Sequence, residues 1–312
     1  MKKLFTVFTC LILALCLALP LVACTQPHQC ESVCSVCGSC TNASCFQDAC
    51  ATKCTCNAQT ETKVTHTQWN ILKDNTHAGK SAQTAVHKFV ADKAGPRIAI
   101  VGGTHGDEVA GWTAALRLVD QISSLNGICG EILIIPQANI VADNACKRYV
   151  GESDVVNLNR VFPIGQIANA DEEVVAIARA IIKVIEDFDP DYVVDLHESR
   201  GSWTDKGNTS ATLGDTLIFS NEALFMDDLL HNYNDNYRGL GEPTFAAEPA
   251  VKAGSFSLYF STTYPDRPVF TVETNRNYDY STKTDRMPLE TRVRQQLNIL
   301  NSLFDLAWER LI

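Results

Sequence analysis

The chain has few positively charged residues, and they do not cluster along the sequence. Its 312 residues include 26 Lys and Arg against 36 Asp and Glu, which gives a formal net charge of −10. A nucleic-acid-binding face needs a basic stripe or patch, and Lys and Arg form none here. We therefore expect no nucleic-acid partner. The chain also has no internal repeat, and its length is close to that of one α/β enzyme domain with appendages.

Residues 24–56 contain few large apolar side chains and so cannot build a hydrophobic core. After Cys24, this segment holds eight further cysteines: Cys30, Cys34, Cys37, Cys40, Cys45, Cys50, Cys54 and Cys56. An even number of cysteines outside the cytoplasm favours disulfides. The first spacings are also similar to the start of an iron–sulfur run, although the next cysteine comes late and no Pro follows it. A metal site is therefore the alternative, and catalysis by these thiols comes third.

The amino-terminal residues predict export. A cationic start, Met1-Lys2-Lys3, precedes an apolar run over residues 4–19, which is typical of a signal peptide. Leu21-Val22-Ala23-Cys24 resembles the lipobox of bacterial lipoproteins, in which the cysteine carries the lipid. We expect a signal peptide over residues 1–23 and a lipid anchor at Cys24 on the outer face of the bacterial cytoplasmic membrane. An ordinary secretory signal or an uncleaved membrane anchor is the alternative.

A globular domain is expected over residues 65–312, after a cysteine-rich segment and linker over residues 24–64. The polar, Thr-rich stretch at 59–67 is typical of a linker. Apolar runs predict strands at 69–72, 86–90, 98–101, 131–136, 192–196, 216–219 and 268–273, and helical spacing predicts helices at 109–122, 172–188 and 289–311. This alternation predicts a three-layer α/β fold, with a mostly parallel mixed sheet and helices on both faces.

His105, Glu108 and His197 are the candidate metal ligands. His105 and Glu108 follow a Gly-Gly turn at the carboxyl end of a buried strand, where open α/β sheets keep their sites. One imidazole and one carboxylate this close form half of a catalytic zinc site. His197 ends a second buried strand, and neighbouring parallel strands end at the same edge of a sheet. We therefore predict one Zn²⁺ bound by these three residues, with the fourth tetrahedral position open.

Asp195 is the candidate partner of a ligand histidine. It lies two residues before His197 and points to the same side of the strand, so it can accept the other ring proton. Other interpretations exist for each residue alone: His197 as a buried core histidine, and Glu108 as an acidic residue in the first turn of a helix. Each explains one residue, whereas the metal site explains their joint placement.

Two arginines, an asparagine and a glutamate complete the candidate site. Asn159 and Arg160 are adjacent, and the planar guanidinium of arginine is suited to bidentate binding of a carboxylate. Arg148 can stabilise the oxyanion that forms when water adds to a carbonyl. Glu273 ends a strand, where a general base acting on that water would have to lie. Considered alone, Arg160 or Glu273 would more often be one member of a solvent-exposed ion pair.

Together these residues resemble the zinc carboxypeptidase superfamily, in particular its succinylglutamate desuccinylase/aspartoacylase branch. The resemblance runs from about residue 95 to residue 275, and the order of its motifs is more specific than any one motif. It implies the zinc carboxypeptidase-like fold and the following roles: zinc ligands His105, Glu108 and His197, a substrate-carboxylate clamp of Asn159 and Arg160, carbonyl polarisation by Arg148, and general base Glu273. Peptidases of the family also use a mobile tyrosine, for which Tyr259, Tyr264 and Tyr278 are candidates.

The resemblance implies a zinc-dependent hydrolase that cleaves an amide bond in a carboxylate-bearing substrate. The short interval from Glu108 to His197 is similar to the deacylases, and the longer one from His197 to Glu273 is similar to the peptidases. Small peptides and N-acyl amino acids therefore both stay open, and an outward-facing location favours peptides slightly. The alternative from another class is a lipid-anchored substrate-binding protein without catalysis. A third interpretation is that the cysteine segment carries the function, in redox chemistry or metal transfer.

Overall fold

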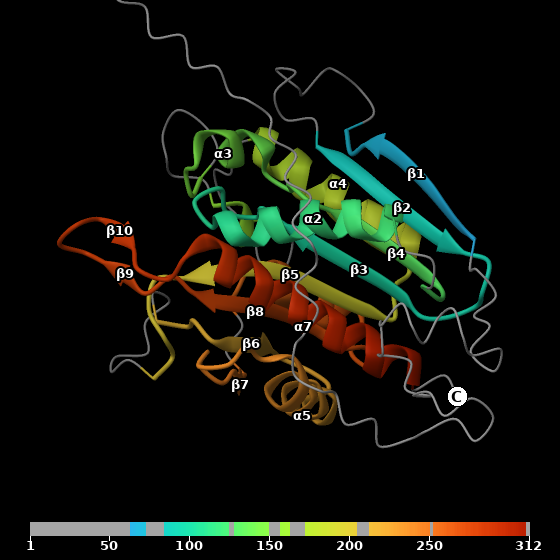
Figure 1. Cartoon of the computed structure of the whole chain (residues 1–312). Coiled ribbons are helices and arrows are strands. Elements are labelled where there is room, and N and C mark those ends of the chain that lie inside the picture. The colour runs from blue at the N-terminus through green and yellow to red at the C-terminus, as the bar shows by residue number, and fades with distance from the viewer. Residues whose placement is uncertain are drawn as a thin grey trace, which may run out of the picture. The chain divides into compact units, whose positions relative to one another are not determined.

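The computed structural model describes most of the chain from residue 63 to residue 309 (Figure 1). The described residues are 63–72, 84–124, 128–149, 157–162, 172–204, 212–249 and 252–309. The predicted signal peptide at 1–23, the lipid anchor at Cys24 and the eight cysteines at 30–56 lie outside them. Cys129 and Cys146, the cysteines within the described ranges, are both free thiols.

A single mixed sheet of eight strands forms the centre of the domain, in the order β1-β2-β4-β3-β5-β8-β6-β7. Its strands are β1 Val64–Asn70, β2 Ala85–Ala91, β3 Arg97–Gly102, β4 Glu131–Ile135, β5 Tyr192–Ser199, β6 Thr216–Phe219, β7 Ala246–Glu248 and β8 Val269–Asn275. Strands β4, β3, β5 and β8 are parallel neighbours, and β1, β2 and β6 join by antiparallel pairing. All eight residues of β5 are buried, as expected for a parallel strand covered on both faces.

Helices cover both faces of this sheet (Figure 1). They are α2 Val109–Ser124, α3 Ile140–Ala145, the 3₁₀ turn η2 Leu158–Arg160, α4 Glu172–Phe188, α5 Ala223–Asn232, the π-helical turn η3 Tyr233–Tyr237, α6 Phe256–Thr263 and α7 Leu289–Glu309. One apolar core lies beneath α2, α5 and α7, and a second lies beneath α4 and α6. The predicted three-layer α/β fold is therefore confirmed. No helix in the described ranges combines the length and apolar character needed to cross a bilayer.

The sheet differs from the sequence prediction at its first edge. Residues 64–67, expected to be part of a linker, form the first half of β1, and this strand ends at Asn70 rather than at residue 72. Strand β1 is an edge strand paired only with β2, and most of its side chains are exposed. Backbone pairing and β-branched threonines stabilise such a strand without an apolar run. The polar sequence of residues 64–67 therefore did not predict a strand. A small hairpin, β9 Tyr278–Asp279 and β10 Thr284–Asp285, follows β8.

Candidate active site

Two glycines shape the loop that carries His105 and Glu108 from the end of β3 to the start of α2. Gly103 has a φ of +73°, and a Cβ there would lie 2.4 Å from Oδ2 of Asp143. A Cβ on Gly106 would lie 2.1 Å from the carbonyl carbon and oxygen of Ala142. The loop therefore packs directly on α3, at a distance that only glycine permits.

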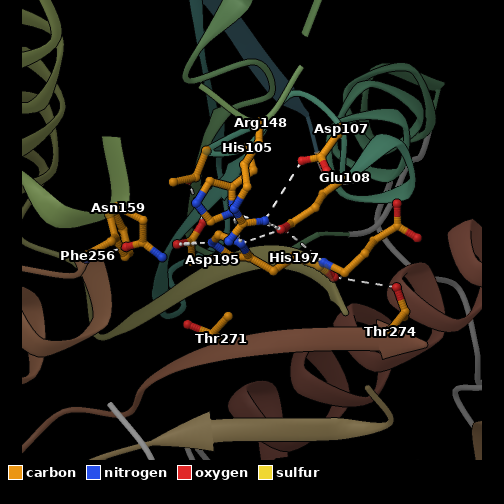
Figure 2. Close-up of polar contacts among 12 residues, drawn as sticks. His105, Asp107, Glu108, Arg148, Asn159, Asp195, His197, Phe256, Thr271 and Thr274 are labelled. Atoms are coloured by element: carbon orange, nitrogen blue, oxygen red, sulfur yellow. Dashed lines mark hydrogen bonds and ion pairs between the residues drawn. The ribbon is translucent and has the colours of Figure 1, made fainter. Parts of the chain in front are cut away.

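His105, Glu108 and His197 meet at the carboxyl edge of the sheet (Figure 2). Nδ1 of His105 lies 2.9 Å from Oε1 of Glu108 and 3.1 Å from Nδ1 of His197. Nδ1 of His197 lies 2.7 Å from Oε2 of Glu108. All three side chains are almost completely buried. Three residues from two distant parts of the chain thus present their donor atoms to one point, as the strand ends predicted.

Asp195 and Thr104 orient His197. Oδ2 of Asp195 lies 2.7 Å from Nε2 of His197, and Oδ1 of the same carboxylate accepts a hydrogen bond of 3.0 Å from the hydroxyl of Thr104. Because the carboxylate accepts, Nε2 of His197 carries a proton and donates it. Nδ1 of His197 is left facing Glu108. This is the contact predicted for Asp195.

Asn157 orients His105 in a similar way, although its partner atom is an amide oxygen. Oδ1 of Asn157 lies 2.9 Å from Nε2 of His105 and accepts a second hydrogen bond of 2.9 Å from the backbone N–H of Asn159. Since this atom accepts from a backbone donor, it is the oxygen, and Nε2 of His105 donates to it. Both imidazoles therefore direct Nδ1 toward Glu108. Two imidazole nitrogens and one carboxylate, each oriented by an outer partner, fit the His₂Glu donor set of catalytic zinc.

The electrostatics of the cluster favour a bound cation. Burial alone would raise the pKa of Glu108, but His105, His197 and Arg148 outweigh burial and hold it well below its usual value. Burial lowers the pKa of His105 despite the opposing effect of Glu108. Burial alone would also lower the pKa of His197, yet Asp195 and Glu108 raise it well above its usual value. An anionic Glu108 and a neutral His105 are the forms that bind metal. The anionic surroundings that raise the pKa of His197 favour positive charge, and a bound cation would take the place of the Nδ1 proton on His197.

Arg148 lies beside the candidate ligands, in the segment that follows α3. Its Nη1 donates to Oε1 of Glu108 at 2.5 Å and lies 3.9 Å from Oδ1 of Asp107. Burial alone would lower the pKa of this guanidinium, but Glu108 and Asp107 raise it above its usual value. The charge predicted to stabilise an oxyanion is therefore at the site and is shared with a candidate ligand.

All the candidate residues except Glu108 and Asp195 line one small cavity of about 60 Å³. Its lining comprises His105, Arg148, Asn159, Arg160, Leu213, His197, Ile218, Lys252, Ser255, Ser257, Thr271 and Glu273. Typical small-molecule pockets have volumes of roughly 300–1,000 Å³, so this cavity has room for the reacting end of a substrate only. A larger cavity of about 520 Å³, between α4 and strands β1, β2 and β4, contains none of the candidate residues.

Asn159 and Arg160 lie on η2 at one wall of the cavity. Oδ1 of Asn159 accepts a hydrogen bond of 2.8 Å from the backbone N–H of Phe256, and Nη1 of Arg160 donates to the carbonyl of Asn159 at 2.5 Å. Burial, together with Arg148, lowers the pKa of Arg160. Within the described ranges, no carboxylate pairs with its guanidinium. A half-buried guanidinium without an acidic partner is suited to an incoming anion.

Glu273, on β8, also lines the cavity. It is the register partner of His197 in the parallel pair β5–β8, so the two side chains project to the same side of the sheet. Burial, with a smaller effect of Glu108, raises the pKa of Glu273 to about 8. Thr271, two residues earlier, shares this side and forms a hydrogen bond with the hydroxyl of Ser257. A carboxyl group with a pKa near neutrality can both accept and return a proton.

Sequence reasoning missed several residues that contact the site. Thr104 directly precedes His105, and Asn157 lies two residues before Asn159. This proximity to predicted site residues is the sequence signal that could have identified them. Lys252 and Ser257 carry no such signal, because they reach the cavity only through the packing of α6 and its preceding loop.

The three tyrosines considered for the mobile family tyrosine do not line the cavity. The hydroxyl of Tyr259 donates to Glu186 at 2.7 Å, and the ring of Tyr278 lies beside the guanidinium groups of Arg200 and Arg276.

Comparison with known proteins agrees with this geometry. Residues 94–204 match the family model of the succinylglutamate desuccinylase/aspartoacylase catalytic domain. This range contains every predicted metal and substrate-binding residue and excludes Glu273. The chain is 31% identical over 103 residues to the N-alpha-acetyl-L-2,4-diaminobutyric acid deacetylase of Halomonas elongata, and the match covers 33% of this chain and 28% of that protein.

Two solved structures share the fold. Helicobacter pylori Csd4, a D,L-carboxypeptidase in its mDAP-bound form, superposes with a TM-score of 0.53 at 18% identity, over 68% of this chain and 51% of Csd4. A metallo-carboxypeptidase from Burkholderia cenocepacia gives a TM-score of 0.55 at 11% identity, over 81% of this chain and 66% of that one.

The chain therefore spans about a quarter of the length of the deacetylase and about half of Csd4. Residues 94–204 match the family model of the succinylglutamate desuccinylase/aspartoacylase catalytic domain, and they lie within a carboxypeptidase-like α/β fold that holds a candidate His-Glu-His metal site.

Proposed function

We propose that this protein is a zinc-dependent hydrolase that cleaves an amide bond next to a free carboxylate in its substrate. One observation carries the proposal: His105 and His197, which form a cluster with Glu108, line the same cavity as Arg160 and Glu273. A binding protein without catalysis would need neither an oriented donor set nor a carboxyl group with a raised pKa beside it. The similarity of residues 94–204 to a deacylase catalytic domain supports the same reaction class.

The residues divide the work of the reaction between them. A bound zinc ion would supply Lewis-acid activation of water and of the scissile carbonyl. Glu273 accepts the proton of the attacking water and afterwards donates it to the leaving amine, which its raised pKa permits. Arg148 stabilises the negative charge that develops on the carbonyl oxygen. Asn159 and Arg160 bind the substrate carboxylate and so hold the amide bond beside Glu273.

Two substrate classes fit this arrangement, an N-acyl amino acid and a short peptide. The deacetylase of Halomonas elongata acts on an N-acetylated amino acid by its name, and sequence similarity to it supports the first class. Csd4 is a carboxypeptidase that shares the fold, which is consistent with the second. We also propose export and lipid anchoring at Cys24, because of the amino-terminal sequence pattern. At that location, peptides and cell-wall fragments would be the available substrates.

The decisive experiment measures metal content and hydrolysis on the same preparation. The purified protein is stripped with a chelator, reloaded with Zn²⁺ and incubated with short peptides, muropeptides and N-acyl amino acids. We expect one zinc ion per chain and zinc-dependent release of a free amino group from carboxylate-bearing substrates. Absence of stoichiometric zinc, with binding but no turnover of any compound, would instead support a binding protein.

A further inference from the structure

One side-chain oxygen connects the candidate metal site to the candidate carboxylate clamp. Oδ1 of Asn157 accepts from Nε2 of His105 and from the backbone N–H of Asn159, at 2.9 Å in each case. His105 is a candidate ligand, and Asn159 belongs to the clamp. In the described part of the chain, this oxygen is the one hydrogen-bonded link between residues 157–162 and the three candidate ligands.

The other end of the 157–162 segment is attached to α6 and the loop before it. The backbone N–H of Phe256 donates to Oδ1 of Asn159 at 2.8 Å, and the N–H of Phe162 donates to the carbonyl of Gly254 at 3.1 Å. The clamp is therefore held between two supports. One is part of the core, and the other is a histidine whose protonation pattern changes when a cation binds.

Metal binding requires a lone pair on Nδ1 of His105, which places the ring proton on Nε2. A proton on Nε2 needs an acceptor, and Oδ1 of Asn157 is that acceptor. Without a cation, the ring can instead carry its proton on Nδ1 and donate it to Glu108, 2.9 Å away. In that tautomer, Nε2 no longer donates to Asn157, and one support of the clamp is lost.

We propose that Asn157 couples metal binding to the substrate-carboxylate clamp, so that the clamp is fully ordered only when the cation is bound. The coupling rests on the proposed function in assigning the cation to His105. It makes Asn157 a positioning residue that acts through His105 and Asn159. By linkage, occupancy of the clamp also strengthens metal binding by the same factor. Asp195 is the natural control, because it orients His197 but, among the residues that the structure describes, forms no hydrogen bond with the clamp.

Hydrogen exchange measured by mass spectrometry tests the coupling without any substrate. Amide exchange over residues 157–162 is compared in metal-free and Zn²⁺-saturated protein, for wild type, Asn157→Ala, Asn157→Asp and Asp195→Asn. We expect Zn²⁺ to slow exchange of this segment in wild type by about fivefold or more, at the lower end of typical coupling factors. Asn157→Asp keeps the acceptor oxygen and should keep the effect. Asp195→Asn should weaken zinc affinity by about 10–100-fold but keep the effect at saturation.

In Asn157→Ala, saturating Zn²⁺ should protect the His105–Glu108 loop but leave exchange over 157–162 unchanged. A residue that only caps the η2 turn would speed exchange equally with and without Zn²⁺, and wild type would show no zinc effect on this segment. Zinc uptake without slower exchange in wild type, or a full zinc effect in Asn157→Ala, would overturn the coupling alone. No zinc uptake by wild type would overturn the proposed function and the coupling together. If the alanine variant does not fold, the absence of a zinc effect on residues 157–162 in zinc-loaded wild type still overturns the coupling.

Discussion

Glu273 and His197 occupy paired positions on the adjacent parallel strands β8 and β5, at the carboxyl edge of the sheet. The pairing places a half-buried carboxyl group beside a candidate metal ligand through backbone register alone. Because both residues lie on hydrogen-bonded strands rather than on loops, their separation is fixed by the sheet. A rigid base next to the reacting atoms is the arrangement that proton transfer requires.

Replacing Glu273 with Gln should abolish turnover without releasing the metal. Glutamine keeps the size of the side chain but cannot accept a proton, so kcat should fall by about 10²–10⁴-fold, the usual contribution of a general base. Zinc content by mass spectrometry should stay at the wild-type level, since Glu273 is not a candidate ligand. Glu290→Gln, at an exposed pair with Arg117, is the matched control and should keep kcat. Wild-type turnover by Glu273→Gln would remove the base assignment.

Zinc should stabilise the fold through the three buried ligands. A ligand that binds only the folded state raises the unfolding free energy by about 2.7 kcal/mol at a free concentration of 100 times its Kd. We expect chelation to lower the thermal midpoint and Zn²⁺ to restore it, as measured by calorimetry. His197→Ala should lose the zinc response. His231→Ala, at an exposed histidine on α5, should keep it, and a retained response in His197→Ala would place the metal elsewhere.

The central sheet was predictable because its strands are buried on both faces and must be apolar along their whole length. Strands β3, β4 and β5 can be recognised in the sequence by these apolar runs. Strand β1 does not, because at the sheet edge backbone pairing replaces apolar burial. The short helices α5 and α6 were also missed, since eight to ten residues carry too little periodicity against a mixed background.

The candidate site was predictable where a polar residue interrupts or ends an apolar strand. His105, His197 and Glu273 stand out for this reason, since a buried strand has little other use for an ionisable side chain. Lys252 and Ser257 approach the cavity through tertiary packing of a loop, which leaves no local pattern. The link through Asn157 depends on which atoms face each other. No sequence pattern contains that information.

Arg160 should determine the affinity for a substrate carboxylate. Its guanidinium lines the cavity, and within the described ranges no acidic group neutralises it. Arg160→Ala should raise KM by about 10–150-fold, which corresponds to the loss of a charged hydrogen bond, and should change kcat less. Arg160→Lys should recover only part of the affinity, because an ammonium group cannot bind a carboxylate bidentately. Arg179→Ala, in the larger cavity far from the site, is the control. An unchanged KM in Arg160→Ala would place the clamp elsewhere.

Asp143 should make the protein less stable as the pH rises. Its side chain is 2% exposed, and burial raises its pKa to about 9 against a smaller opposing effect of Gln137. Between about pH 4, where the carboxyl of an unfolded chain ionises, and pH 9, folding must therefore take up a proton. The folded state loses about 1.4 kcal/mol of stability for each pH unit in this window, and the loss is complete above the folded-state pKa.

Asp143→Asn tests this, because asparagine has the shape of the neutral acid and does not ionise. Denaturant unfolding at pH 5, 6, 7 and 8 should show the variant gaining stability over wild type at each step. Most of the difference should appear by pH 8, whereas the two proteins should converge toward pH 4. The exposed Asp92→Asn is the control, and its unfolding free energy should follow that of wild type at every pH. If the unfolding free energies of Asp143→Asn and wild type instead changed in parallel with pH, Asp143 would be ionised in the folded protein. A positively charged group would then have to neutralise this carboxylate beneath the Gly103 turn.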